Sequence, residues 1–232
     1  MILTKIEVPE CVPDNVRAPL SLLTGEALDL SSDWKLFNGL FVDAAENIEL
    51  INKTAPMFFQ RIQSLLYESL LIGVSRFTDR QSMRNGNQNL VLDDLFTDEK
   101  PSQLKELEET TQNIRKIRHK VVGHLDREYG FNPSLLPDKN VISEIKKSVE
   151  LIEKIIDEAW QKWASENNFI ATFCFTGPSE TIEILNCLQK AHIYDRLENE
   201  KIVPEIFWNY PEDMVENYFK NNSVQKLKSP KG

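Results

Sequence analysis

The sequence predicts an all-α protein, an antiparallel bundle of long helices followed by additional C-terminal helices. Apolar residues recur at helical spacing through residues 34–77 and 102–168, and turn-forming residues separate these stretches. With 232 residues, of which 41% are hydrophobic and 27% charged, the chain is long enough to fold around a sizeable core. No apolar run approaches the roughly 20 residues that a membrane span needs, so we expect a soluble protein with no membrane contact.

The N-terminal third begins irregularly and then turns helical. Residues 1–30 carry three prolines and are expected to form an irregular lead-in across the surface. A first helix is predicted over residues 34–51 from its apolar spacing. Pro56 opens a second helix that runs to Phe77, proline being favourable in a first turn. This second helix is apolar on more than half of its circumference, which predicts that it is the central, most buried helix.

Further helical segments follow, separated by proline, glycine or turn residues such as Asn85-Gly86. They comprise a short turn at 90–96, a third long helix at 102–128, a fourth at 141–168, and shorter helices at 178–192 and 211–221. The expected organisation is a lead-in (1–30), a helical bundle (31–168) and a C-terminal helical extension packed on that bundle (169–232).

Composition limits the classes of function. The formal net charge of −9 and a pI of about 5.0 argue against broad coating of nucleic acid, so no DNA binding is expected. Three scattered cysteines are typical of the reducing cytoplasm. His119 and His124 form the only close histidine pair and have no cysteine near them, so no metal site is expected. No glycine-rich phosphate loop occurs, and no cofactor is predicted.

One local basic segment, IRKIRHKVVGHLDRE (114–128), stands out. On an α-helix with Ile114 set at 0°, the packing face extends from about −20° at Val121 to about 80° at Val122, and Arg118 lies at about 40°, in the middle of this face. A guanidinium buried there needs a partner. One interpretation is a structural ion pair, to Asp79, Asp43 or Glu46. The other is that this face borders a cleft or a subunit interface, where Arg118 binds a phosphate with its forked geometry.

The two histidines of this segment also allow two interpretations. His124 lies at the border of the apolar stripe, near the end of the predicted helix, where an imidazole can simply interact with the helix dipole. His119 and the neighbouring Arg115 and Lys120 are predicted to lie on the solvated side. Alternatively, His124 takes part in proton transfer, for which its ordinary pKa of about 6.5 is well suited.

The segment resembles the HEPN superfamily (higher eukaryote and prokaryote nucleotide-binding domains). The signature of that superfamily is arginine, four to six residues, then histidine, and Arg118 and His124 are separated by five, with His119 directly after the arginine. The wider RHKVVGHLD and the preceding LLIGVSRFTDR, which ends in an Arg-x-x-Asp turn, are similar to the abortive-infection branch of HEPN proteins. Asp126 stands where nucleotide-modified HEPN toxins have a tyrosine, so control by modification of that residue is not expected.

The resemblance implies a metal-independent endoribonuclease, toxin-like and acting in phage defence or stress, with two copies of the motif meeting in a homodimer. It implies catalytic roles for Arg118, His124 and His119. Arg115, Lys120 and Arg127 are then expected to bind the RNA. RNA and a second copy are the expected partners, and a cognate antitoxin protein is a further possibility.

Two alternatives remain open from the sequence. One is a non-catalytic module that uses the same basic pocket to bind a nucleotide, RNA or a regulator. The other is a structural motif in a fold that serves protein–protein contact, which a monomer in solution with Arg118 paired internally to a carboxylate would indicate.

Overall fold

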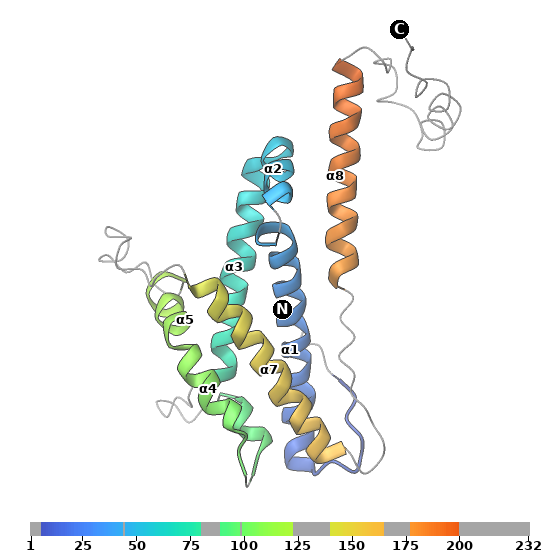
Figure 1. Cartoon of the computed structure of the whole chain (residues 1–232). Helices are drawn as coiled ribbons and strands as arrows, with labels where there is room; N and C mark the ends of the chain where they lie inside the picture. The colour runs from blue at the N-terminus through green and yellow to red at the C-terminus, as the bar shows by residue number, and fades with distance from the viewer. Residues whose placement is uncertain are drawn as a thin grey trace. The chain divides into compact units, whose positions relative to one another are not determined.

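The computed structural model describes residues 6–43, 45–79, 89–97, 99–122, 140–164 and 177–199. Within these ranges the secondary structure is helical, which confirms the all-α class (Figure 1). The elements are α1 (Asp14–Phe41), α2 (Ala45–Thr54), α3 (Pro56–Thr78), the 3₁₀ turn η1 (Leu92–Leu95), α4 (Ser102–Thr110), α5 (Gln112–Ile117), the π-helical segment η2 (Arg118–Val122), α7 (Val141–Ala164) and α8 (Gly177–Asn199).

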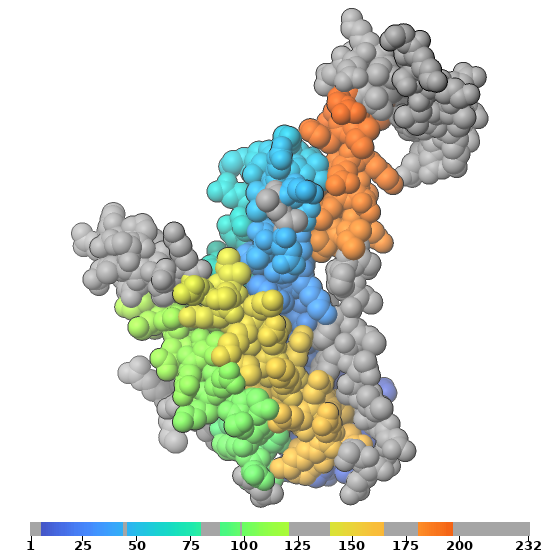
Figure 2. Space-filling view, viewed as in Figure 1, coloured from blue at the N-terminus to red at the C-terminus, as the bar shows by residue number. Residues whose placement is uncertain are grey.

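The core lies between α1, α3 and α7, and α4 and α5 close it from one side. α1 contributes apolar residues three or four positions apart, and α7 does the same, so each helix presents one continuous stripe to the others. At the contact of α1 with α7, the Trp160 indole Nε1 donates a hydrogen bond of 2.9 Å to Thr24 Oγ1. Figure 2 shows α7 against α4 and α5 on one face of the bundle.

The expectation of an irregular lead-in over residues 1–30 is wrong, because Asp14–Phe41 is one helix of 28 residues with Pro19 inside it. Proline in a helix removes one hydrogen bond, but Asn15, whose carbonyl loses its partner, is exposed and can bind water. Burial of Val16 and Leu20 on either side offsets the cost. The irregular part is confined to the described residues before Asp14.

The other helices differ from the prediction in two respects. The first predicted helix, 34–51, is interrupted after Phe41, and α2 begins at Ala45. α3 has nearly the predicted bounds, but it is not the most buried helix, since α1 and α7 each bury more residues. The N-terminal half of α3 faces solvent, and Phe58 and Leu65 are 60% and 44% exposed. Its neighbours α1, α5 and α7 therefore leave part of the apolar surface of α3 uncovered.

The predicted helix 102–128 is divided at Thr111 into α4 and α5 and continues as η2. α7 begins at the predicted residue, and α8 extends beyond its predicted end at His192. The helix expected at 211–221 lies outside the described residues. The chain divides into two compact units, residues 1–183 and 184–232, and the bundle belongs to the first.

Candidate functional site

The candidate site is built where the C-terminal end of α3 meets the junction of α4 and α5. Thr111 is fully buried at that junction, and its hydroxyl has two acceptors for its one proton: Thr78 Oγ1 at 3.4 Å and the Glu108 carbonyl at 3.3 Å. Arg115, one turn later, donates from Nη1 to the Thr78 carbonyl at 3.2 Å and from Nη2 to the Glu108 carbonyl at 3.3 Å. Both carbonyls lie in the last turns of their helices, where carbonyl groups have no helical partner and the dipole is negative. Arg115 thus fixes α5 against α3 and α4.

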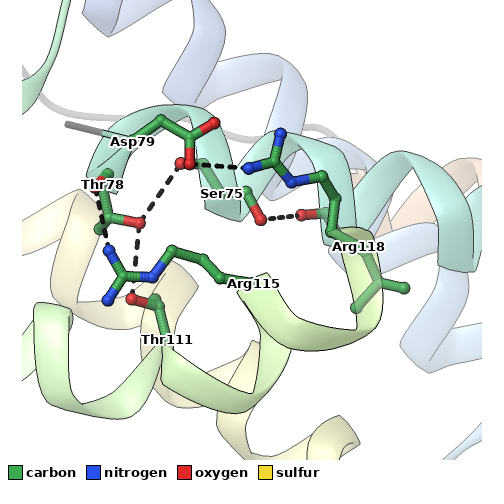
Figure 3. Close-up of polar contacts among 7 residues, drawn as sticks. Ser75, Thr78, Asp79, Thr111, Arg115 and Arg118 are labelled. Atoms are coloured by element: carbon green, nitrogen blue, oxygen red, sulfur yellow. Dashed lines mark hydrogen bonds and ion pairs between the residues drawn. The ribbon is translucent and has the colours of Figure 1, made fainter. Parts of the chain in front are cut away.

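Arg118 extends from the next turn toward the same end of α3 (Figure 3). Its Nη2 donates to Asp79 Oδ1 at 2.8 Å, and the two side chains are 33% and 24% exposed. Ile114 and Ile117, on the same helix, are buried in the core. The Nε atom of Arg118 is buried and has no hydrogen-bond partner among the described residues. The guanidinium is therefore anchored at one end, desolvated along one edge, and open to solvent elsewhere.

The pairing with Asp79 confirms one of the partners that the sequence suggested for Arg118. It also joins the two segments on which the HEPN resemblance rested, because Asp79 closes the Arg-x-x-Asp turn and Arg118 opens the second motif. Arg76, the first residue of that turn, points elsewhere and pairs with Glu26 of α1 at 3.1 Å. Of the turn, Thr78 and Asp79 belong to the site.

The motif itself, RHKVV, adopts a π-helical turn at Arg118–Val122. π-turns close hydrogen bonds over five residues rather than four, are rare, and are frequent at functional sites. Angles calculated for a regular α-helix therefore do not hold beyond Arg118. The His119 side chain is exposed, and that of Lys120 is partly buried.

The remaining predicted site residues divide into two groups. His124 and Arg127 lie outside the described residues, so the separation of Arg118 and His124 stays a prediction. Arg115 is described, and the expectation that its side chain is fully solvated is wrong, because its guanidinium donates to two backbone carbonyls. Its role in binding RNA stays a prediction. Arg115 turns inward because the ends of α3 and α4 offer it the carbonyls of Thr78 and Glu108 as acceptors.

A cavity of about 520 Å³ lies beside the site, with Thr78 and Glu108 in its wall. Its charged lining consists of Asp93, Asp94, Glu108 and Lys100, and Lys100 is paired with Asp93 at 2.6 Å. Three carboxylates against one ammonium disfavour a phosphate group there. The basic side chains of the motif, rather than this cavity, are the part of the site that suits an anion.

The described residues contain neither a metal-binding cluster nor a membrane-spanning helix. No group of three or more histidine, cysteine or acidic side chains is arranged to hold a metal ion there. Within the same residues, no helix combines the length and the apolar character needed to span a membrane.

The protein is a helical bundle in which an Arg-x-x-Asp turn faces an arginine motif that begins at Arg118. These are the features of a HEPN-type domain. Comparison with known proteins gives the particular family: the family model described as AbiU2, a HEPN family, matches residues 14–173. Because that match covers more than half of the chain, the protein belongs to the AbiU2 family of HEPN proteins. No curated protein and no solved structure matches the chain.

Proposed function

We propose that the protein is a metal-independent endoribonuclease of HEPN type, toxin-like, that acts in phage defence or stress as a homodimer with a composite site. In this proposal Arg118 binds the scissile phosphate, His124 is the general acid or base, and His119 supports it. Lys120 and Arg127 bind the RNA backbone. Arg115 has the structural role described above.

The chemistry needs few groups. The RNA 2′-oxygen attacks the adjacent phosphorus and gives its proton to a base; the bond from phosphorus to the 5′-oxygen breaks, and that oxygen takes a proton from an acid. A cation beside the phosphate stabilises the charge that develops between these steps. Histidine can be either base or acid near neutral pH. One His124 cannot fill both roles at once, and a twofold dimer supplies a second copy.

The observation that supports the proposal most directly is the environment of Arg118. A guanidinium has five N–H donors, and Asp79 accepts from Nη2, while a third of the side chain remains exposed. Asp79 holds the planar group in one orientation without enclosing it. An entering phosphate would find the exposed edge preorganised, which reduces the entropy lost on binding.

The test is an RNA cleavage assay with purified protein in the presence of a metal chelator. His124→Ala and Arg118→Ala should each reduce the cleavage rate by at least about a hundredfold, while circular dichroism stays unchanged. His192→Ala and Lys116→Ala are matched controls, since both side chains are exposed, and should cleave normally. Full activity in the His124→Ala variant would refute the assignment.

A mixing experiment tests the composite site. When subunits of an excess of His124→Ala protein are exchanged into parent dimers, the mixed dimers should be inactive, because each retains only one His124. Mixed dimers that keep about half of the parent activity, in a sample that mass spectrometry shows to contain them, would place the whole site within one subunit.

A second function, a non-catalytic fold that serves protein–protein contact, is favoured by one observation. Arg118 already has a carboxylate partner at 2.8 Å, which competes with any phosphate. The same assay separates the functions. A parent protein that neither binds nor cleaves the RNA supports protein–protein contact, whereas RNA that is bound and stays intact supports a non-catalytic binding module.

A further inference from the structure

A groove of about 400 Å³ lies between α1 and α3, remote in sequence from the arginine motif. Its apolar lining is formed by Leu30 of α1 and by Leu65 and Ile72 of α3. Gly73 also lines it and brings the helices close together: a β-carbon at this position would lie 2.8 Å from Leu30 Cδ1. The groove is therefore a shallow apolar channel along two closely packed helices.

The exposed face of α3 has the spacing of a helix that packs against another helix. Phe58, Leu65 and Ile72 are each seven residues apart, and Ile62 and Ser69 lie between them in the alternate heptad position. Fourteen residues correspond to about 21 Å of helix. Phe58 and Leu65, 60% and 44% exposed, extend the apolar lining beyond the groove toward the N-terminus of α3.

The borders of the groove are acidic. Glu26, Asp29, Asp33 and Glu68 line it together with one cation, Arg76, which is paired with Glu26 at 3.1 Å. Asp29 and Asp33 are one helical turn apart, an arrangement of like charges that destabilises a helix. Burial raises the pKa of the Asp33 carboxyl and the charge of Asp29 raises it further, against the lowering effect of the hydrogen bond from Ser69.

These charges distinguish between the possible occupants. Four carboxylates and one guanidinium give the lining a net charge of −3. A second copy placed by a twofold axis would bring the same −3 against it, and an RNA backbone would also be repelled. A helix with an apolar stripe flanked by lysine or arginine suits both the apolar lining and the acidic borders.

We propose that the α1–α3 groove binds a basic amphipathic helix of a partner protein. Leucine or isoleucine side chains of that helix pack on Leu65 and Ile72, and its flanking cations pair with Asp29, Asp33 and Glu68. This site is independent of the proposed ribonuclease activity, and its test uses no RNA.

The experiment measures binding of two designed helical peptides to the full chain by fluorescence anisotropy. Both peptides carry leucine and isoleucine at heptad positions a and d; one has lysine at the flanking positions and the other glutamate. The lysine peptide should bind, more weakly as salt rises, and the glutamate peptide should not. Leu65→Asp should weaken binding about tenfold or more, since the apolar contact is lost from an exposed position.

A second pair of variants tests the contribution of the acidic borders to peptide binding. Glu68→Lys should weaken binding of the lysine peptide several-fold, whereas Glu150→Lys, an equally large charge change at an exposed position on α7, should leave it unchanged. Absence of binding by the lysine peptide, equal binding of both peptides, or full binding by the Leu65→Asp variant would overturn the proposal. So would sedimentation data in which Leu65→Asp converts a dimer to a monomer, because the occupant would then be a second copy.

Discussion

The ion pair between Arg118 and Asp79 allows a quantitative prediction. Exposed pairs contribute at most about 1 kcal/mol, whereas breaking a buried pair costs about 3 to 5 kcal/mol. At 2.8 Å and with side chains 33% and 24% exposed, this pair lies between the two cases. We expect a coupling free energy of about 1 to 2 kcal/mol, smaller in high salt because the open edge is screened.

The measurement is a double-mutant cycle of Arg118→Gln and Asp79→Asn, with urea unfolding followed by circular dichroism for all four proteins. Each single variant should be less stable than the parent, and the double variant should lose less than the sum of the two. Lys116→Gln, an exposed neighbour of Arg118, is the control and should change stability little. Additive losses, within about 0.3 kcal/mol, would show that the contact at 2.8 Å does not stabilise the fold.

Three further predictions concern the core and its charges. Ile155→Ala, at a fully buried site on α7, should lower the free energy of unfolding by about 2 to 5 kcal/mol in urea titrations. Trp160→Phe should cost about 1 to 3 kcal/mol and lower the Tm, because the buried hydroxyl of Thr24 loses its donor. Burial, and secondarily Glu153, raises the pKa of Asp157, so folding favours its protonated form. The ionised Asp157 carboxylate therefore destabilises the folded protein at pH values above its raised pKa, and this destabilisation is absent below the ordinary pKa of aspartate. Asp157→Asn should accordingly raise the Tm at neutral pH and leave it unchanged in acid.

Several features of the fold were readable because they follow from local chemistry. Proline in a first turn marked the start of α3 at Pro56, and the apolar period gave the start of α7 at Val141. Asp79 was among the partners suggested for Arg118, because the carboxylate directly follows a helix that must pack on the motif. The signals at Pro56 and Val141 lie within a few residues of the helix starts that they predict, whereas Asp79 and Arg118 are 39 positions apart.

Other features depend on contacts that the sequence does not display. Pro19 suggested an irregular segment, but burial of the residues around it decides in favour of the helix. The division at Thr111 has only a weak local signal, the β-branched pair Thr110-Thr111, and rests on a hydrogen bond to Thr78 of another helix. Arg115 was assigned to solvent from its angle on the helix, but its long side chain reaches the carbonyls of Thr78 and Glu108 at the ends of two other helices, which the sequence does not display.

The contact of α1 with α7 has a consequence for biosynthesis. Thr24 and Trp160 are separated by 136 positions, so at about 5 to 20 residues per second a ribosome needs roughly 7 to 27 s to supply the second after the first. During that interval α7 has not been synthesised, so the leucines and valines of α1 that pack against it are exposed. Such exposed apolar surface favours aggregation and binds chaperones. Truncated products that end before Val141 should accordingly accumulate in the insoluble fraction, whereas products that end after Ala164 should not.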